Sequence, residues 1–432
     1  MTALRAGFAQ RDITPPLGLP LGGYGARAGG ADGVLDPLYC RAAYFDDESE
    51  PVAVMVFDLV HVFGSWTAQV RQRVEQRLGI AGPHCLIAAT HTHAGPGVFR
   101  SAIATAPEVQ KYETELIEQT VSCLAQAKRA AVPAGIRFGT APTRGVAANR
   151  RDPSLSVDET VRVLAAHTPA GELAGVVANF ACHPTVLPAA NHAYSGDLFG
   201  AAATQAAKLL HAPVMLTNGA AGDVSTRFTR REQTHAEVQR LGGRLAEAIA
   251  AAVRGALPLP AAVPLGAVTR SVPVRRRELA SPQFAAAQLQ AALDDLAAVQ
   301  QRSADAAAVR LAQSRVEGAQ AELWLSNRGG WEALFGCRPP RAELQALHCG
   351  DLTIVAAPGE LFSGAGRWLH QQLGERTLVV GYANDYLGYF VPHAEAAAGG
   401  YEALIAMVDP RCEESIRCGL IDTAGRANER LG

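Results

Sequence analysis

The sequence predicts an α/β protein in which a mixed sheet core is flanked by helices and carries an Ala-rich helical insertion. Near-continuous apolar runs at 52–57 and 175–182 are typical of buried strands. A strand–helix–strand order over residues 52–89 indicates helices layered on a sheet. A change in composition over about 281–325 marks the insertion. We therefore expect one domain over residues 1–432 that this insertion interrupts.

Alternation of apolar and polar stretches defines the elements of the first part of the chain. Residues 38–45 and 52–57 are predicted to form a hairpin around the polar turn 46–51. The next elements follow from the same patterns: helices over about 66–78 and 107–129, and strands at 85–89, 136–139, 145–148 and 161–166.

The second part continues the pattern, with helices at about 198–210 and 232–254 and strands at 175–182, 213–217, 352–357 and 378–382. The insertion at 281–325 is rich in Ala, Gln and Leu and has no glycine before Gly318, which favours one long helix or a helical hairpin. We interpret it as a structural segment packed on the core. The alternative is a functional segment, either a lid or a dimerisation arm. A dimerisation arm would make the protein a homo-oligomer. No internal repeat is evident in the sequence.

Composition excludes several classes of protein. Of the 432 residues, 48% are hydrophobic and 19% charged, as in ordinary globular proteins, and a net charge of −2 argues against nucleic-acid binding. No apolar run approaches the ~20 residues of a transmembrane segment, and the N-terminus lacks the apolar region of a secretory signal. The eight cysteines are scattered without a C-x-x-C pair, which favours reduced thiols. We expect a cytoplasmic protein.

The most informative motif is Thr-His-Thr-His-Ala-Gly-Pro-Gly at residues 90–97, which follows the apolar run 85–89. His91 and His93 are two positions apart at a strand end, so their side chains are expected on the same side. The Gly-Pro-Gly ends the strand in a tight loop. Paired imidazoles at such a position are typical of a metal site. The motif therefore predicts a metal-dependent hydrolase.

Four further strands end abruptly in polar residues, and sites in α/β proteins collect at strand carboxyl ends. They place His183 at 180–184, Asp223 and Ser225 in the loop 216–225, Glu360 at 355–362, and Asn384 with three tyrosines at 381–389. Histidine and carboxylate ligands with an open position are the pattern of catalytic zinc, and no cysteine cluster has structural-zinc spacing.

Each of these residues also has a structural interpretation. A single strand-end histidine such as His183 is often a satisfied core residue. Glu360 follows Pro-Gly and would suit the first turn of a helix. Ser225 would suit a turn or a helix cap, and Tyr389 would suit packing. Glycines 219 and 222 either make a turn or let backbone N–H groups face a developing oxyanion.

Together these segments resemble the catalytic domain of the neutral (non-lysosomal) ceramidase family. The matching pieces run along nearly the whole chain in the family's order, at 11–16, 89–97, 149–150, 179–185, 195–197, 222–225, 358–362 and 384–389. The resemblance implies one catalytic zinc ion (Zn2+) with four ligands, namely His91, His183, Glu360 and Tyr389. It also implies that His93 and Arg150 line the site, and Ser225 matches a serine proposed in that family as a nucleophile.

The sequence departs from the secreted ceramidases at three points. No signal peptide is visible, and the chain ends soon after the Tyr-x-x-Tyr segment instead of continuing into a C-terminal β-sandwich domain. Thr226 and Arg227 follow Ser225 where Pro-Asn is usual. The helical segment at 281–325 is typical of short bacterial relatives. These departures leave the zinc chemistry in place and leave the substrate open.

The expected reaction is zinc-assisted hydrolysis of an N-acyl amide to a fatty acid and an amine, so the expected partner is a small-molecule or lipid amide. Zinc activates water and polarises the carbonyl. His93 or Arg150, with the backbone near Gly222, would stabilise the oxyanion, and His93 or Tyr389 would protonate the leaving amine. Ser225 would orient the leaving group. A covalent serine mechanism is less favoured, because a serine nucleophile needs an adjacent base.

Three alternatives stay open. The first keeps the site but acts on a non-lipid amide, a lactone or an ester of a cytoplasmic metabolite. The second is a catalytically silent binding protein, against which the intact set of four ligands argues. The third is an amidohydrolase-like barrel, which would need eight strand–helix units and a late catalytic aspartate.

Overall fold

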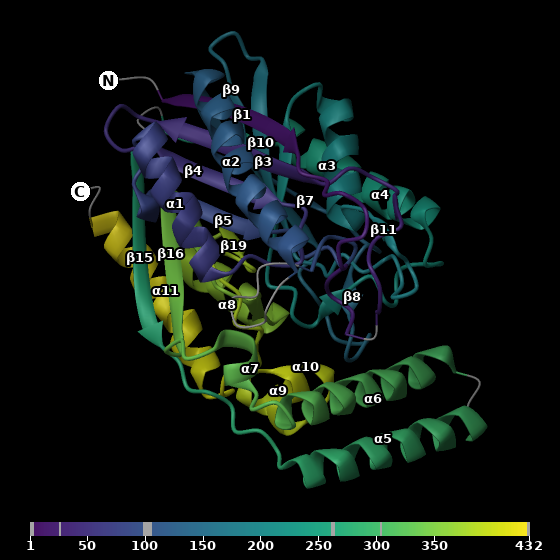
Figure 1. Cartoon of the computed structure of the whole chain (residues 1–432). Helices are drawn as coiled ribbons and strands as arrows, with labels where there is room; N and C mark the ends of the chain where they lie inside the picture. The colour runs from purple at the N-terminus through teal and green to yellow at the C-terminus, as the bar shows by residue number, and fades with distance from the viewer. Residues whose placement is uncertain (1–3, 26, 98–105, 261–263, 303–304, 430–432) are drawn as a thin grey trace.

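In the described part of the chain, three mixed sheets of four or five strands carry helices on their outer faces (Figure 1), and three further sheets have two strands each. The computed structural model describes residues 4–25, 27–97, 106–260, 264–302 and 305–429. This confirms the predicted α/β class. Three separate sheets, each with antiparallel pairs, rule out the parallel eight-stranded barrel among the alternatives.

The first sheet has the strand order β5-β4-β3-β1-β6. Its strands β1, β3 and β4 pair in antiparallel order, and β5 lies parallel to β4 after the crossover through α1. Both faces of β4 are buried, which explains its continuous apolar sequence. The bounds are β1 Arg5–Asp12, β3 Tyr39–Asp46, β4 Val52–Phe57, α1 Gly64–Leu78, β5 Cys85–Ala89, α2 Pro107–Arg129 and β6 Val132–Pro133.

The second sheet has the order β12-β10-β9-β7-β14. Strands β7, β9 and β10 are antiparallel, and β12 lies parallel to β10 after the crossover through α3. The helices α3 and α4 pack on each other and on this sheet. The bounds are β7 Gly135–Pro142, β9 Thr160–His167, β10 Leu173–Phe180, α3 Asp197–Leu210, β12 Val214–Asn218, α4 His235–Arg254 and β14 Leu257–Pro258.

The third sheet has the order β15-β16-β17-β19. Strands β15, β16 and β17 are antiparallel, and β19 lies parallel to β17 after the crossover through α8. Helix α11 packs on β15 and β16. The bounds are β15 Leu265–Pro273, β16 Arg341–Cys349, β17 Leu352–Ala356, α8 Ser363–Leu373, β19 Thr377–Val380 and α11 Cys412–Glu429.

The three sheets repeat one topology, in which three antiparallel strands are followed by a helix, a parallel strand and a second helix. The repetition is one of topology, and no corresponding repeat is evident in the sequence. Two glycines illustrate the equivalence of the first two units. A Cβ on Gly7 in β1 would meet the carbonyl oxygen of Ala127 in α2 at 2.1 Å, and a Cβ on Gly139 in β7 would meet that of Ala252 in α4 at 2.1 Å. Glycine therefore permits the same close approach of helix to strand in both units.

One apolar core joins the three sheets. It contains residues from the inner face of each, including Val54 of β4, Val177 of β10 and Ile354 of β17. Two other clusters fill the spaces between the sheets and the outer helices. The carboxyl ends of β5, β10 and β17 consequently open toward a common region, where the candidate residues lie.

The predicted insertion is a helical hairpin, α5 Pro282–Arg302 and α6 Ala306–Ser326, and the residues 303–304 between the helices lie outside the described part of the chain. The hairpin lies beside the body of the molecule (Figure 1). Helix α6 packs on α10, whereas Ala285 is the one buried residue of α5. The remaining short elements are η1 Gly82–His84, α7 Trp331–Phe335, α9 His393–Ala397, α10 Tyr401–Ile405, and the strands β2 Gly33–Val34, β8 Ala148–Asn149, β11 Ala193–Tyr194, β13 Val224–Ser225, β18 Glu360–Leu361 and β20 Tyr389–Phe390.

The other predicted elements agree with the structure to within a few residues, except at 145–148. There the chain turns, and Ala148 is the first residue of the short β8. The turn residue Gly145 has a φ of 70°, which a strand does not allow. All eight cysteines are free, as expected. Within the described residues no helix is long and apolar enough to cross a membrane.

Candidate metal centre

His91 and His93 lie just beyond the end of β5, as the motif predicts. His91 is buried and has a positive φ of 70°, an uncommon conformation for a residue other than glycine. Its Nδ1 lies 2.7 Å from the carbonyl oxygen of Val60. Because a carbonyl can only accept, Nδ1 carries the proton and Nε2 presents a lone pair to the site.

His183 follows β10 and is fully buried. Its Nδ1 lies 2.6 Å from the carbonyl oxygen of Ala221 and 3.2 Å from that of Val224. These contacts set the same tautomer as in His91, with a free lone pair on Nε2. Such backbone contacts are how proteins orient histidines that bind metals.

The imidazoles of His91, His93 and His183 converge, and their ligand atoms all lie within 4.8 Å of one another. The Nε2 atoms of His91 and His93 are 3.2 Å apart. Burial lowers the pKa of His91 to about 4 and that of His93 well below its usual value, so both rings are neutral at pH 7. A neutral imidazole is the form that binds a metal ion.

Unlike His91 and His183, His93 has no backbone carbonyl that binds its Nδ1 among the described residues. Its buried Nδ1 has no hydrogen-bond partner among the described residues. The ring is held by packing against Tyr24, with ring centroids 4.8 Å apart, and against Gly23, where a Cβ would lie 2.3 Å from its Cγ. Gly23 has a φ of 88°, so both its conformation and its lack of a side chain make room for His93.

Glu360 lies in the two-residue strand β18, which pairs with β20. The alternative of a first-turn residue is wrong, because α8 begins only at Ser363. The Glu360 carboxylate is buried, with Oε2 2.9 Å from His183 Nε2 and Oε1 3.6 Å from His91 Nε2. Burial alone would raise its pKa, but the neighbouring His91 and His183 outweigh burial and lower it to about 2. The carboxylate is therefore ionised.

Two tyrosines donate hydrogen bonds to this carboxylate, and sequence reasoning assigned no role to either. Tyr386 Oη lies 2.5 Å from Oε1 of Glu360, and Tyr382 Oη lies 3.3 Å from Oε2. The Tyr382 ring also stacks on His91, with centroids 4.2 Å apart. Their place after β19, next to Tyr389, was the only signal that could have identified them.

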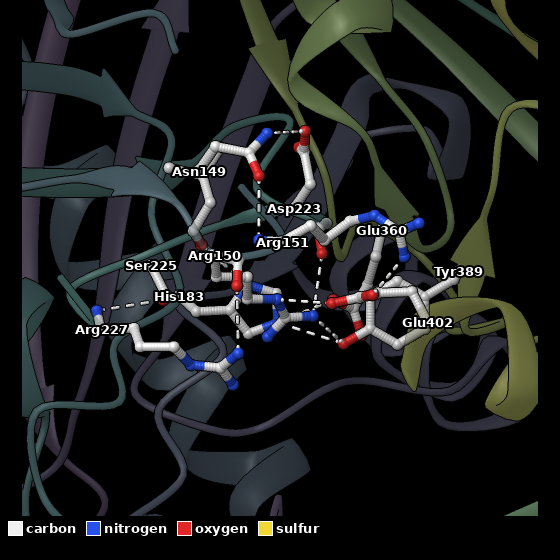
Figure 2. Close-up of polar contacts among 12 residues, drawn as sticks. Asn149, Arg150, Arg151, His183, Asp223, Ser225, Arg227, Glu360, Tyr389 and Glu402 are labelled. Carbon is white, nitrogen blue, oxygen red and sulfur yellow. Dashed lines mark hydrogen bonds and ion pairs between the residues drawn. The ribbon is translucent and has the colours of Figure 1, made fainter. Parts of the chain in front are cut away.

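Tyr389 and Arg150 form the other side of the site. Tyr389 Oη lies 3.3 Å from His183 Nε2, and Arg150 Nη2 donates to the same Oη at 2.8 Å (Figure 2). Burial raises the pKa of Tyr389 well above its usual value although Arg150 opposes the shift. The phenol therefore keeps its proton at neutral pH in this environment.

A buried acidic residue, which sequence reasoning missed, positions Arg150. Glu402 of α10 forms ion pairs of 2.8 Å with Arg150 Nε and with Arg151 Nη1 (Figure 2). Arg151 also pairs with Glu395 at 3.1 Å. No local motif could reveal this network, because Arg151 and Glu402 are 251 positions apart.

The loop 216–225 contributes less chemistry than predicted. Ser225 Oγ accepts a hydrogen bond from the backbone N–H of Arg227 at 3.2 Å, and no imidazole is among its recorded partners within the described residues. Asp223 is structural, since its Oδ1 accepts from the N–H of Ser363 at 2.6 Å at the start of α8 and its Oδ2 accepts from Asn149 at 2.8 Å.

The backbone N–H groups of Gly219 and Gly222 already have hydrogen-bond partners. The N–H of Gly222 donates to the carbonyl of Leu361 at 2.8 Å, and that of Gly219 donates to Phe180 at 2.9 Å. Both glycines serve close packing instead, because a Cβ on Gly222 would lie 2.9 Å from Phe362. The N–H groups of these two glycines are therefore engaged within the protein.

The site is thus a buried group of imidazoles beside an ionised carboxylate, at the strand ends of a three-sheet α/β protein. The orientation of His91 and His183 toward one point fits a metal centre of the hydrolase type. The family model described as neutral/alkaline non-lysosomal ceramidase, N-terminal, matches residues 4–221. The chain belongs to this family, and this membership supports a ceramidase-like hydrolase.

Solved structures agree with this assignment at the level of the fold. The neutral ceramidase from Pseudomonas aeruginosa is 21% identical with a TM-score of 0.76, over 100% of this chain and 75% of that chain. A ceramidase complexed with C2 is 19% identical with a TM-score of 0.76, over 100% of this chain and 76% of that one. No curated protein matches the sequence.

Proposed function

We propose that this protein is a zinc-dependent hydrolase that cleaves the carbon–nitrogen bond of an N-acyl amide to give a fatty acid and an amine. The observation that carries the proposal is the pair His91 and His183, each with Nδ1 held by a backbone carbonyl and Nε2 directed at the buried Glu360 carboxylate. This donor set suits zinc, which binds imidazole nitrogen and carboxylate oxygen.

We assign the four ligands to His91, His183, Glu360 and Tyr389, with His93 lining the site. The three histidines converge closely enough for His93 to be a rival ligand. Against that, His93 Nδ1 lacks the backbone contact that orients the other two. A bound zinc ion would supply water activation and polarisation of the scissile carbonyl.

The residues around the centre have distinct parts in the reaction. Arg150 keeps its positive charge, because its hydrogen bond to Tyr389 and its ion pair with Glu402 more than offset the effect of burial on its pKa, and it would stabilise negative charge on the carbonyl oxygen. The neutral imidazole of His93 would take up a proton at Nε2 and pass it to the leaving amine. Ser225 would contact the leaving group, and a covalent serine mechanism is disfavoured because its Oγ has no recorded base.

We also propose that residues 1–432 act as one catalytic domain. The shared apolar core of the three sheets supports this, and so does the origin of the ligands, because β5, β10 and β17 belong to different sheets. The intact donor set disfavours a silent binding protein on the same scaffold.

The test is hydrolysis of a panel that contains ceramide, short N-acyl amides, a lactone and an ester, before and after treatment with EDTA. We expect amide cleavage that disappears on chelation and returns with zinc. Amide cleavage that survives EDTA and is abolished by Ser225→Ala would overturn the zinc mechanism. If the protein cleaves only the lactone or the ester, the proposed metal centre stands and the proposed amide substrate is wrong.

A further inference from the structure

Two arginines beside the candidate centre keep hydrogen-bonding capacity that the described protein residues do not use. Arg227 Nη1 donates to the carbonyl of Arg150 at 3.1 Å. Arg230 Nη1 donates to the carbonyl of Thr185 at 2.9 Å and lies 3.3 Å from Thr226 Oγ1. A guanidinium has five N–H donors, so the Nε and Nη2 groups of both side chains stay without a recorded partner in the described residues.

Neither arginine has a carboxylate within ion-pair distance in the described part of the chain, in contrast to Arg150 and Arg151 nearby. The acidic groups around them are committed elsewhere. Asp197 accepts from the backbone N–H groups of 186, 187 and 198, Glu402 pairs with Arg150 and Arg151, and Glu317 pairs with Arg310. The two positive charges are therefore not neutralised by direct contact with this protein's own carboxylates.

Arg227 and Arg230 lie on the same turn of the backbone. The N–H of Arg230 donates to the carbonyl of Thr226 at 2.8 Å, which closes a helical turn over 226–230. Residues three apart on such a turn face the same side. Both arginines are half-buried, so a ligand could reach them from solvent while much of each stem stays packed.

This turn is tied to the candidate centre. The backbone N–H of Arg227 donates to Ser225 Oγ, and Arg227 lies beside Arg150 (Figure 2). Arg230 bonds the carbonyl of Thr185, two residues after His183. More positive charge comes from Arg27, whose Nη1 donates to the carbonyl of His93 at 2.6 Å.

Repulsion among these groups adds to the argument from geometry. Burial lowers the pKa of Arg227, Arg150 and Arg310 lower it further, and Glu402 and Glu317 oppose the shift. Burial also lowers the pKa of Arg230, where Arg310 adds to the effect, and Tyr24 and Asp197 oppose it. A bound anion would relieve this repulsion.

We propose that Arg227 and Arg230 form an anion subsite beside the metal centre, and that the amide substrate carries a carboxylate or phosphate group which binds there. The inference rests on the proposed amide hydrolysis and narrows its substrate class to acidic N-acyl amides, such as an amino acid acylated on nitrogen. A planar guanidinium fork suits a carboxylate or a phosphate, because it can donate two parallel hydrogen bonds.

The experiment compares substrates that share an N-acyl group and differ in the terminal group: an N-acyl amino acid, the same compound with its carboxylate converted to a carboxamide, and an N-acyl aminoalkyl phosphate. The quantity measured is the ratio of kcat/KM for an acidic substrate to kcat/KM for the neutral one. We expect the wild-type ratio to exceed 1, and the acid that gives the higher ratio identifies the group. Arg227→Gln and Arg230→Gln should each lower the ratio by about 10- to 100-fold, the range for a charge-assisted hydrogen bond.

Two controls separate charge from structure. Arg227→Lys should retain part of the preference, and Arg73→Gln on the exposed face of α1 should leave the ratio unchanged. Binding of an N-alkyl amino acid, which has no scissile amide, should weaken by the same factor in calorimetry with Arg227→Gln. A wild-type ratio at or below 1, or equal losses on acidic and neutral substrates in Arg227→Gln, would overturn the subsite. Failure to cleave any amide would instead overturn the proposed function.

Discussion

Three residues other than glycine near the candidate centre have strained backbone conformations with positive φ. Within the described residues, His91, Tyr382 and Asn384 have positive φ values of 70°, 56° and 64°. Such conformations cost on the order of 1–3 kcal/mol each and persist only where surrounding contacts hold them. Here those contacts include the backbone hydrogen bond from His91 to Leu59 and that from Tyr382 to Gly359. The strain therefore serves to aim an imidazole and a phenol at Glu360.

The hydrogen bond from Tyr386 to Glu360 should matter for metal affinity. Tyr386→Phe removes the 2.5 Å contact that orients the carboxylate while keeping the ring that packs there. We expect zinc affinity to fall about 10-fold or more, as is usual when the support of a ligand is removed. Competition with a chelator measures this. Tyr44→Phe, which removes a hydrogen bond to Asp46, is the control, and equal affinities in the two variants would contradict the assignment.

His370 on α8 should make stability depend on pH. Burial, and then the nearby Arg162, lowers its pKa from 6.5 to about 4, although Asp158 opposes this. Between these values the unfolded chain takes up a proton that the folded protein excludes. Stability is thus fully present above pH 6.5 and falls toward pH 4, by up to roughly 3 kcal/mol. Thermal unfolding between pH 6.5 and pH 4 should show a smaller loss of stability for His370→Gln than for the wild type. His393→Gln, at an exposed histidine, is the control and should behave as the wild type. Identical stability–pH profiles for His370→Gln and the wild type would contradict this prediction.

At the scale of single elements, the strand ends were predictable and the supporting helices were not. The strands that lead to His91 and His183 are apolar runs that stop at polar residues, so local pattern was sufficient. The network of Glu402 with Arg150 and Arg151 depends on α10, a five-residue helix whose place is set by tertiary packing. The same holds for β18 and β20, which are strands only because they pair with each other.

The helical hairpin contacts the candidate site indirectly, because α6 packs on α10 and α10 carries Glu402, the partner of Arg150. Gly318 of α6 lies where a Cβ would meet Tyr401 Cα at 3.0 Å and Leu404 at 3.1 Å. Gly318→Leu should therefore displace α10 and, through Glu402, Arg150. We expect a loss of about 1–3 kcal/mol in the free energy of unfolding and a lower kcat/KM. Gly425→Leu in α11, where a Cβ meets nothing within 4 Å, is the control. If Gly318→Leu and Gly425→Leu have the same stability and the same kcat/KM, α6 does not hold α10 and Arg150 in position.

At the scale of the whole molecule, three units of the same topology meet at one core and each contributes to one centre. The first supplies His91 and His93, the second His183, and the third Glu360 and Tyr389. The sequence conceals this repetition, because the core strands need only apolar residues of suitable size and permit different residues at most positions. Close contacts such as those at Gly7 and Gly139 are the few points where the units must agree.

If these units together bind one zinc ion, the purified protein should contain it, so the decisive measurement is its metal content. Metal analysis of the purified protein should find about one zinc per chain in the wild type and in His235→Ala, whose imidazole pairs with Asp36 and is not among the converging histidines. His183→Ala should lose both the metal and the amide cleavage. A wild-type protein without metal whose activity resists EDTA, or full zinc retention in His183→Ala, would contradict the account.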